Sequence, residues 1–189
     1  MPSPLRLLMT ITDHEPPPDA ATGSVRRQVW LGGATELTTR TMIADPPRWL
    51  TITEYETAPP AYAPACAMEH AVLHWEMEQL LPGRALSAEN AGGVILVSMD
   101  VDPAREDEFN DWYNTEHIPH FTGVPGVILA RRFRAITGAP RYVALYHVED
   151  TDVYASRAWM IANETPWILR MRRFQRNRTY YMFRERRVI

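Results

Sequence analysis

The chain has 189 residues, of which 46% are hydrophobic and 23% are charged, and its formal net charge is −3. This composition is typical of a globular protein, argues against disorder, and gives no strong attraction for nucleic acid or acidic membranes. The single cysteine, Cys66, and the absence of lysine exclude an intramolecular disulfide, a cysteine-only zinc cluster and Schiff-base chemistry on a lysine amine.

Two runs in the first half have strand character and one has helix character. Leu5–Ile11 and Trp49–Thr57 are rich in apolar and β-branched residues, which favours strands. The three consecutive prolines in Glu15–Pro18 cannot continue a helix, so a helix after the first strand would be degraded. Ala63–Leu81 carries apolar residues at helical spacing and predicts a strong helix. Those apolar positions are Leu73, Met77, Leu80 and Leu81.

In the second half, glycine and proline mark the ends of the expected helices and strands more clearly than in the first half. Asp102 and Pro103 supply a side-chain cap and a first-turn proline for a helix. We expect that helix to end near His117, because Pro119 disfavours helical geometry at the residue before it. The resulting order, β-α-β-β-α-β, is that of a ferredoxin-like unit. The expected elements are strand Gly93–Val101, helix Asp102–His117, strands Val127–Ile136 and Arg141–Val148, a helical stretch Asp152–Arg173 interrupted near Pro166, and strand Arg176–Arg186.

Three short segments recur in the same order in both halves, which indicates an internal repeat. Two such units would stack their sheets against each other, with helices outside, around a continuous core. We therefore predict an α+β fold of two ferredoxin-like β-α-β-β-α-β repeats, with a degenerate one at residues 1–90 and another at 91–189. The matched segments are Leu5–Ile11 with Ile95–Val101, Pro47–Leu50 with Pro140–Val143, and Ala61–Ala63 with Val153–Ala155, at offsets of 90, 93 and 92 residues.

The densest group of chemically active residue types lies at the end of the second half's first helix. Helical spacing places Trp112, Tyr113 and Glu116 on one broad face. His117 follows at the expected helix end, where unpaired carbonyl groups would favour a protonated imidazole that exchanges its proton near neutral pH. A structural role fits the same pattern, in which the rings pack on the sheet while Glu116 and His117 cap the last turn.

The run Phe109–Pro119, FNDWYNTEHIP, together with three shorter motifs, resembles the EthD-like group of the dimeric α/β-barrel superfamily. The resemblance covers roughly residues 93–150 and implies that the two repeats pack as an intramolecular version of that barrel. In many members a pocket opens between helices and sheet, and a helix histidine acts in acid–base chemistry. The first half lacks Glu-His-Ile-Pro, so one functional pocket per chain is expected. The shorter motifs are Val124–Gly126, Arg131–Phe133 and Pro140–Tyr146.

The resemblance implies that His117 is the acid–base residue of a small enzyme that needs no cofactor and no metal. Glu116 would orient or assist it, and Tyr113 would polarise a carbonyl or phenol. The implied substrate is a small apolar metabolite, aromatic or polycyclic. The reaction would be an isomerisation, cyclisation, dehydration or lyase-type cleavage, and the fold does not fix which. The residues expected to bind the substrate are Trp112, His120, Met99, Tyr146 and Arg132.

A haem or metal enzyme using the same histidine stays open as an alternative. In a haem enzyme of oxygenase type, His117 would be the axial ligand. For a metal, His70 and His74 have the spacing of one helix turn, but the HExxH order is missing. A second metal trio would be His117 with His120 and Glu116. The arginines expected to meet haem propionates are Arg131, Arg132 and Arg134.

The remaining interpretations concern partners and location. A non-catalytic ligand-binding or oligomerisation protein of the same fold stays open, as does a homodimer formed through outer faces. The arginine-rich segment 170–178 precedes an alternating strand whose solvated face explains its charge better than nucleic-acid binding does. No apolar run has the length and flanks of a signal peptide or reaches the ~18 residues of a membrane span, so we expect a cytoplasmic protein.

Overall fold

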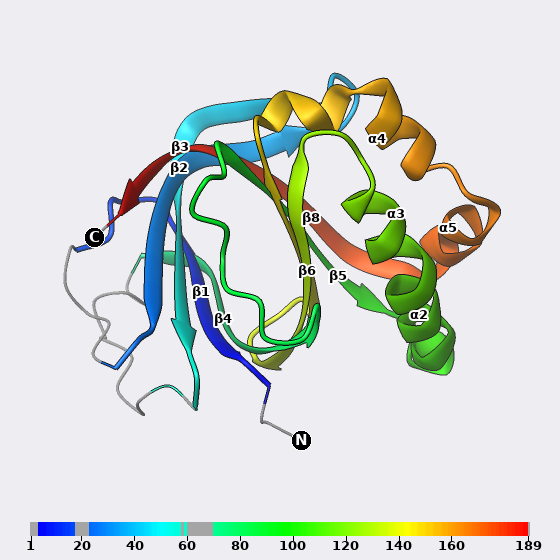
Figure 1. The fold of residues 1–189 in the computed structure, drawn as a ribbon, viewed down its shortest axis with the longest axis horizontal. Coiled ribbons are helices and arrows are strands. Elements are labelled where there is room, and N and C mark those ends of the chain that lie inside the picture. Colours follow the sequence, from blue (N-terminus) through cyan, green and yellow to red (C-terminus); the bar gives the residue numbers. More distant parts are fainter. Residues whose placement is uncertain (1–3, 18–22, 58, 60–69, 189) are drawn as a thin grey trace.

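The structure is a computed structural model that describes residues 4–17, 23–57, 59 and 70–188. In this part of the chain eight strands form a closed barrel in which every neighbouring pair is antiparallel (Figure 1). The strands are β1 (Arg6–Thr12), β2 (Arg26–Glu36), β3 (Thr41–Tyr55), β4 (Ala71–Leu81), β5 (Gly93–Val101), β6 (Val127–Thr137), β7 (Tyr142–Val148) and β8 (Gln175–Val188).

Each half of the chain contributes four adjacent strands, in the same order. Around the barrel the order β4-β1-β3-β2 from the first half is followed by β8-β5-β7-β6 from the second. The pairs β2–β8 and β4–β6 join the two halves. The expected α+β fold, with ferredoxin-like sheets closed into a barrel, is confirmed. Sequence matches between the halves fall on β1 and β5 and on β3 and β7, which hold equivalent places, while the domain division at residue 90 stays a prediction.

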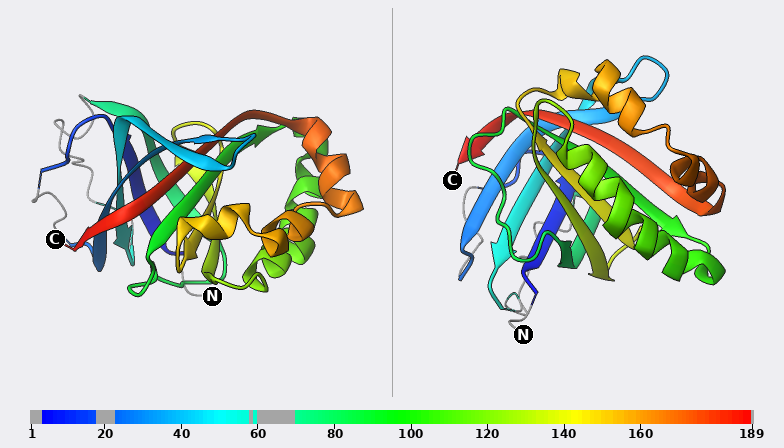
Figure 2. Two further views of the ribbon diagram at one scale, coloured as in Figure 1. Left: turned by 90° about the horizontal axis from the view of Figure 1, so that it is seen from above. Right: turned by 45° about the vertical axis from the view of Figure 1, so that its right-hand side comes forward.

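The described helices all belong to the second half and gather on one side of the barrel (Figures 1 and 2). None of them has the length and apolar character needed to cross a membrane. The α-helices are α2 (Glu106–Trp112), α3 (Ile118–Thr122), α4 (Arg157–Ala162) and α5 (Pro166–Met171). A π-helical turn, η2 (Tyr113–His117), joins α2 to α3, and the 3-10 turns are η1 (Pro103–Arg105), η3 (Thr151–Ala155) and η4 (Arg172–Phe174).

The first helix of the second half starts where the sequence predicts but runs further. The Asp102 side chain accepts a hydrogen bond from the Ala104 backbone N–H at 3.0 Å and caps the first turn. The prediction that the helix ends near His117 was wrong. The π-turn bonds the Ile118 N–H to the Tyr113 carbonyl, and Pro119 then falls in the first turn of α3, where its missing N–H costs nothing.

The expected helix Ala63–Leu81 is corrected over its described part, because residues 71–81 form strand β4. Leu73 and Trp75 alternate with more exposed neighbours and belong to the apolar cluster inside the barrel. Leu73 and Met77 satisfy both a helical and a strand period, so spacing alone misled the prediction. Residues 63–69 lie outside the described part, and no described residue of the first half is helical.

Two separate apolar clusters hold the molecule together. One fills the barrel with inward side chains from all eight strands, among them Trp30, Trp75 and Phe183. The other lies between the helices and the outer face of the four second-half strands, β5, β6, β7 and β8. It is rich in aromatic rings such as Trp112 and Trp159. The second cluster positions the candidate site.

The barrel interior also contains one fully buried ion pair. The Arg131 guanidinium lies 2.6 Å from the Glu54 carboxylate, and both side chains are completely shielded from solvent. Arg131 also donates to the Gln79 side chain and to the Ser87 hydroxyl, and the Ser87 backbone N–H donates to Glu54. Hydrogen bonds on both partners are what a buried ion pair needs to offset its desolvation.

Candidate functional site

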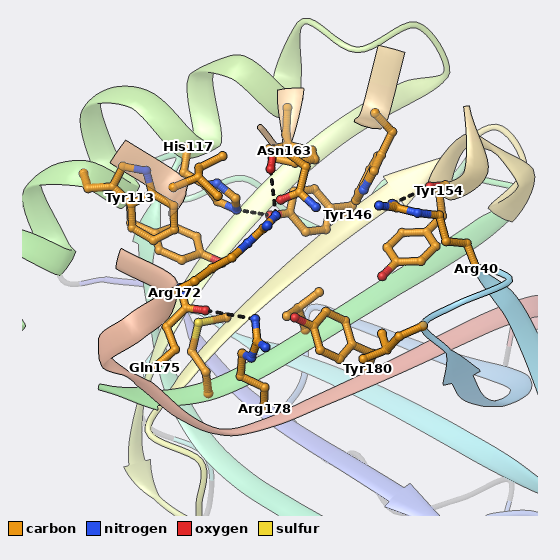
Figure 3. Close-up of a pocket in the computed structure, with 17 residues that line it drawn as sticks. Arg40, Tyr113, His117, Tyr146, Tyr154, Asn163, Arg172, Gln175, Arg178 and Tyr180 are labelled. Atoms are coloured by element: carbon orange, nitrogen blue, oxygen red, sulfur yellow. Dashed lines mark hydrogen bonds between the residues drawn. The ribbon is translucent and has the colours of Figure 1, made fainter. Parts of the chain in front are cut away.

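A cavity of about 270 Å³ lies between the outer face of the second-half sheet and the helices that cover it (Figure 3). Val97 and Met99 on β5 and Tyr146 on β7 line the sheet side. Leu37 and Arg40, from the turn between β2 and β3, close one end, so both halves of the chain contribute. The aromatic rings of the wall are Trp112, Tyr113, Phe121, Tyr146, Tyr154, Trp159 and Tyr180.

His117 lies in the wall of this cavity at the end of the π-helical turn, and only 8% of its surface is exposed. Its Nε2 atom is 3.1 Å from the Tyr146 hydroxyl, and its ring packs on Trp112, Tyr113 and Phe121 with centroid separations of 4.4–4.6 Å. Its Nδ1 atom has no hydrogen-bond partner among the described residues, and neither has the Trp112 indole N–H. Buried polar atoms are normally paired, so these two atoms are unsatisfied groups in residues that line the cavity.

The His117 imidazole is neutral at physiological pH. Its pKa is lowered to about 3, mainly by burial and in addition by the nearby positive charges of Arg132 and Arg172. The expectation of a protonated histidine at a helix end was wrong, because the ring is buried and the helical run continues into α3 instead of ending at His117. A neutral imidazole has one lone pair and one N–H, so it can accept or donate a proton.

The two tyrosines beside His117 are also neutral. Burial raises the pKa of Tyr113 well above its ordinary value, although the nearby Arg132 charge opposes the shift. Burial likewise raises the pKa of Tyr146, and its hydrogen bond with Tyr113 adds to the effect. The site therefore presents two phenolic O–H groups to a ligand or to His117.

Arg132 lies behind this wall and does not face the cavity. Its guanidinium donates to the side-chain oxygens of Asn114 and Asn110 at 2.5 and 2.7 Å. It also stacks on the Tyr113 ring, with Cζ 4.5 Å from the centroid, and is 1% exposed. It therefore acts on the site through its charge and through Tyr113, and not as the substrate contact that we expected.

Two further residues expected at the site also lie outside the cavity wall. Glu116 is half-buried and accepts a hydrogen bond from the Thr165 hydroxyl, which ties the π-turn to the start of α5. His120 is exposed on α3. The cavity therefore does not gather the metal trio of His117, His120 and Glu116.

Other expected metal and haem contacts are not brought together either. His70 and His74 are not one helical turn apart, because β4 begins at Ala71, and the His74 Nδ1 atom lies 2.9 Å from the Thr10 hydroxyl. Of the arginines expected at haem propionates, Arg131 is inside the barrel and Arg134 pairs with Glu78, so the predicted arrangement does not fit. A small exposed group, Asp13, His14 and His70, does have its ligand atoms within 4.8 Å of one another.

Three cavity residues that the sequence did not single out as site residues are arginines: Arg40, Arg172 and Arg178. They come from the β2–β3 turn, η4 and the start of β8, and Figure 3 shows Arg40 beside Tyr154, Arg178 beside Tyr180, and Arg172 reaching towards Asn163 and His117. No local pattern could have identified them, because barrel closure brings together segments separated by more than a hundred positions. Arginine density in residues 170–178 was the one available signal.

No protein-family model and no curated protein matches this sequence, but solved structures share its fold. A "putative monooxygenase" from Lactobacillus acidophilus NCFM superposes with a TM-score of 0.57 and 12% identity over 97% of this chain and 94% of that chain. Another "putative monooxygenase", from Fusobacterium nucleatum subsp. nucleatum ATCC 25586, superposes with a TM-score of 0.58 and 10% identity, over 100% of this chain and 96% of that chain. An "anthrone oxidase-like protein" superposes with a TM-score of 0.56 and 11% identity, over 98% of this chain and 93% of that chain. At such identities the likeness shows the fold, and membership of the EthD-like group stays a prediction.

Proposed function

We propose that the cavity binds an aromatic metabolite and that His117 removes a proton from it, without a cofactor. The observation that carries this proposal is a buried neutral imidazole in the cavity wall whose Nδ1 atom has no hydrogen-bond partner among the residues that the structure describes. An apolar cavity of roughly 150 Å³ admits benzene. The volume of about 270 Å³ therefore has room for two or three fused rings.

The hydrogen bond between His117 and Tyr146 is compatible with a tautomer in which Nδ1 acts as the base. With the proton on Nε2 and donated to the Tyr146 oxygen, Nδ1 presents its lone pair to the ligand. In that tautomer the Tyr146 hydroxyl is free to donate to Tyr113, with which it shares a hydrogen bond. In this arrangement Tyr146 and Tyr113 hold the imidazole in one tautomer and one orientation.

The low pKa of His117 is compatible with a basic role because the products form as a pair. Proton transfer from a carbon acid creates an imidazolium beside an enolate, and the two opposite charges stabilise each other in a dry site. The Arg172 charge, which disfavours imidazolium in the empty cavity, also favours the enolate. The Trp112 N–H and the tyrosine hydroxyls are further donors for a developing oxyanion.

Oxidation by dioxygen is a second candidate, favoured by the names of the fold neighbours. An anthrone-type substrate loses a proton from its CH₂ group to give an electron-rich enolate that dioxygen oxidises. In the balanced reaction the CH₂ group becomes a carbonyl, one oxygen atom enters that carbonyl, and the other leaves as water with the two hydrogens. The first step, removal of a proton by His117, is common to both candidates.

Hydrogen–deuterium exchange tests the shared step. Anthrone and 2-tetralone are incubated with the protein in D₂O, exchange at the acidic carbon is followed by NMR, and an oxygen electrode records dioxygen uptake. We expect His117→Gln to slow exchange by about 10²–10⁴-fold, the usual contribution of a positioned base. His120→Gln, on the exposed face of α3, is the matched control and should exchange at the wild-type rate.

The outcomes separate the candidates. Exchange without dioxygen uptake supports acid–base chemistry alone, and exchange with stoichiometric uptake supports the oxidase. Undiminished exchange in a folded His117→Gln protein contradicts the assignment. Tight binding of both probes without exchange would leave a ligand-binding protein of the same fold.

A further inference from the structure

Among the described residues, the charged side chains in the cavity wall are positive. Arg40, Arg172 and Arg178 line the cavity, and no Asp or Glu of the described part of the chain does. Each guanidinium donates only to neutral oxygens: Arg40 to the Tyr154 carbonyl at 3.3 Å, Arg172 to the Asn163 carbonyl at 2.7 Å, and Arg178 to a side-chain amide at 3.5 Å. Within the described residues none of the three forms an ion pair.

Several arginines elsewhere in the molecule pair with a carboxylate, which these three do not. Arg170 bonds both oxygens of Glu108, Arg134 pairs with Glu78, and Arg131 pairs with Glu54 even inside the barrel. A guanidinium matches a carboxylate geometrically, and a pair of N–H donors left on neutral oxygens retains that capacity. The cavity arginines are therefore cations without anions at a place where a ligand fits.

All three charges lie in the wall of the same cavity. The Arg40 guanidinium carbon lies 5.2 Å from the centre of the Tyr154 ring. Burial raises the pKa of Tyr154 to about 12, and Arg40, Arg172 and Arg178 each act to lower it, so all three charges lie within electrostatic reach of one hydroxyl. Figure 3 shows Arg172 reaching towards His117 and Arg40 on the opposite side beside Tyr154, so the positive charges extend along the cavity away from the imidazole.

We infer that the substrate of the proposed reaction is an aromatic acid, whose carboxylate binds among Arg40, Arg172 and Arg178 while its ring reaches His117. This rests on the proposed function for the reaction, but the anion site stands on its own geometry. A carboxylate fits better than a phosphate, because phosphate sites commonly use backbone N–H groups of glycine-rich turns and no glycine lines this cavity. The inference replaces the purely apolar ligand expected from the sequence.

Calorimetric binding of a matched pair of probes tests the inference. 2-Naphthoate and 2-naphthamide have nearly the same shape and differ in charge. We expect naphthoate to bind at least about tenfold more tightly, since hydrogen bonds to charged groups are the stronger ones. Arg172→Gln and Arg178→Gln should each weaken naphthoate binding by about tenfold and leave naphthamide binding unchanged. Arg173→Gln, an exposed neighbour outside the cavity, is the control and should change neither.

The results distinguish this inference from the proposed function. Equal affinity for the two probes, or equal loss of both in the arginine variants, overturns the anion site whatever His117 does. Binding of 2-naphthyl phosphate tenfold tighter than naphthoate overturns the carboxylate assignment. Retained naphthoate binding by His117→Gln supports a separate anion site. That conclusion remains valid even if the exchange experiment shows that His117 is not the base.

Discussion

Acid should destabilise the native protein specifically through His117. In the unfolded chain this histidine has a pKa near 6.5, whereas burial and nearby arginines lower its pKa to about 3 in the native state. Between these values the unfolded state binds a proton that the native state rejects, so stability falls as the pH falls. The contribution is fully present above pH 6.5 and is lost progressively towards pH 3.

The size of the effect follows from the width of that window. Each pH unit between the two pKa values is worth about 1.4 kcal/mol, so lowering the pH from 6.5 to 4.5 should cost about 3 kcal/mol. The full window from 6.5 to about 3 corresponds to about 5 kcal/mol. For a domain of ordinary stability these losses are large.

Urea unfolding of the wild type and of His117→Gln at half-unit steps between pH 7 and 4.5 measures the effect. Other titrating groups contribute to both proteins, so the difference between the two pH profiles isolates His117. We expect the wild type to lose about 3 kcal/mol relative to the variant over this range. Parallel profiles would refute the neutral, buried imidazole on which the proposed reaction depends.

Three further substitutions test the fold around the site, each by the free energy of unfolding. Glu54→Gln leaves the Arg131 charge uncompensated inside the barrel and should cost about 3–5 kcal/mol, so a loss under about 1 kcal/mol would show that the pair is not buried. Gly138→Ala should cost about 1–3 kcal/mol, because this residue has φ +92° and a Cβ atom would lie 2.2 Å from the His74 carbonyl oxygen. Ser156→Ala removes the side-chain cap of α4 and should cost about 1 kcal/mol, with unchanged stability contradicting the cap.

The second half of the fold could be predicted because the residues that begin and end its helices and strands act locally. Asp102 and Pro103 mark a helix start, and the turns around Gly126 and Gly138, both at positive φ, separate the strands. Strand β5 was predicted at its observed bounds, Gly93–Val101. Each of these signals acts within a few residues, so no knowledge of distant contacts was needed.

Strand β4 shows where local reasoning fails. Its residues alternate inward and outward, but the apolar ones that stand inside the barrel also recur at helical spacing. The deciding force is the pairing of β4 with β1 on one side and β6 on the other, which no window of its own sequence contains. Tertiary pairing thus overrode a pattern that was ambiguous by itself.

The residues of the candidate site also divide into those that the sequence could indicate and those that it could not. His117, Tyr113 and Trp112 belong to one motif on one helical run, and all three line the cavity, as do Met99 and Tyr146 on the sheet beneath. Of the cavity arginines, Arg172 and Arg178 are near neighbours in the sequence, and only the fold brings Arg40 to the same cavity. The sequence could therefore indicate the imidazole and its rings, but not the charges that face them.

The imidazole and the arginines are electrostatically coupled, and this coupling links the two proposals. In the empty cavity the charges of Arg172 and Arg132 add to burial in holding the pKa of His117 low. A bound carboxylate would neutralise part of that positive field, since Arg172 is shared between the two ends of the cavity. The pKa of His117 would then rise, and the imidazole would become a stronger base only when an anionic ligand is present.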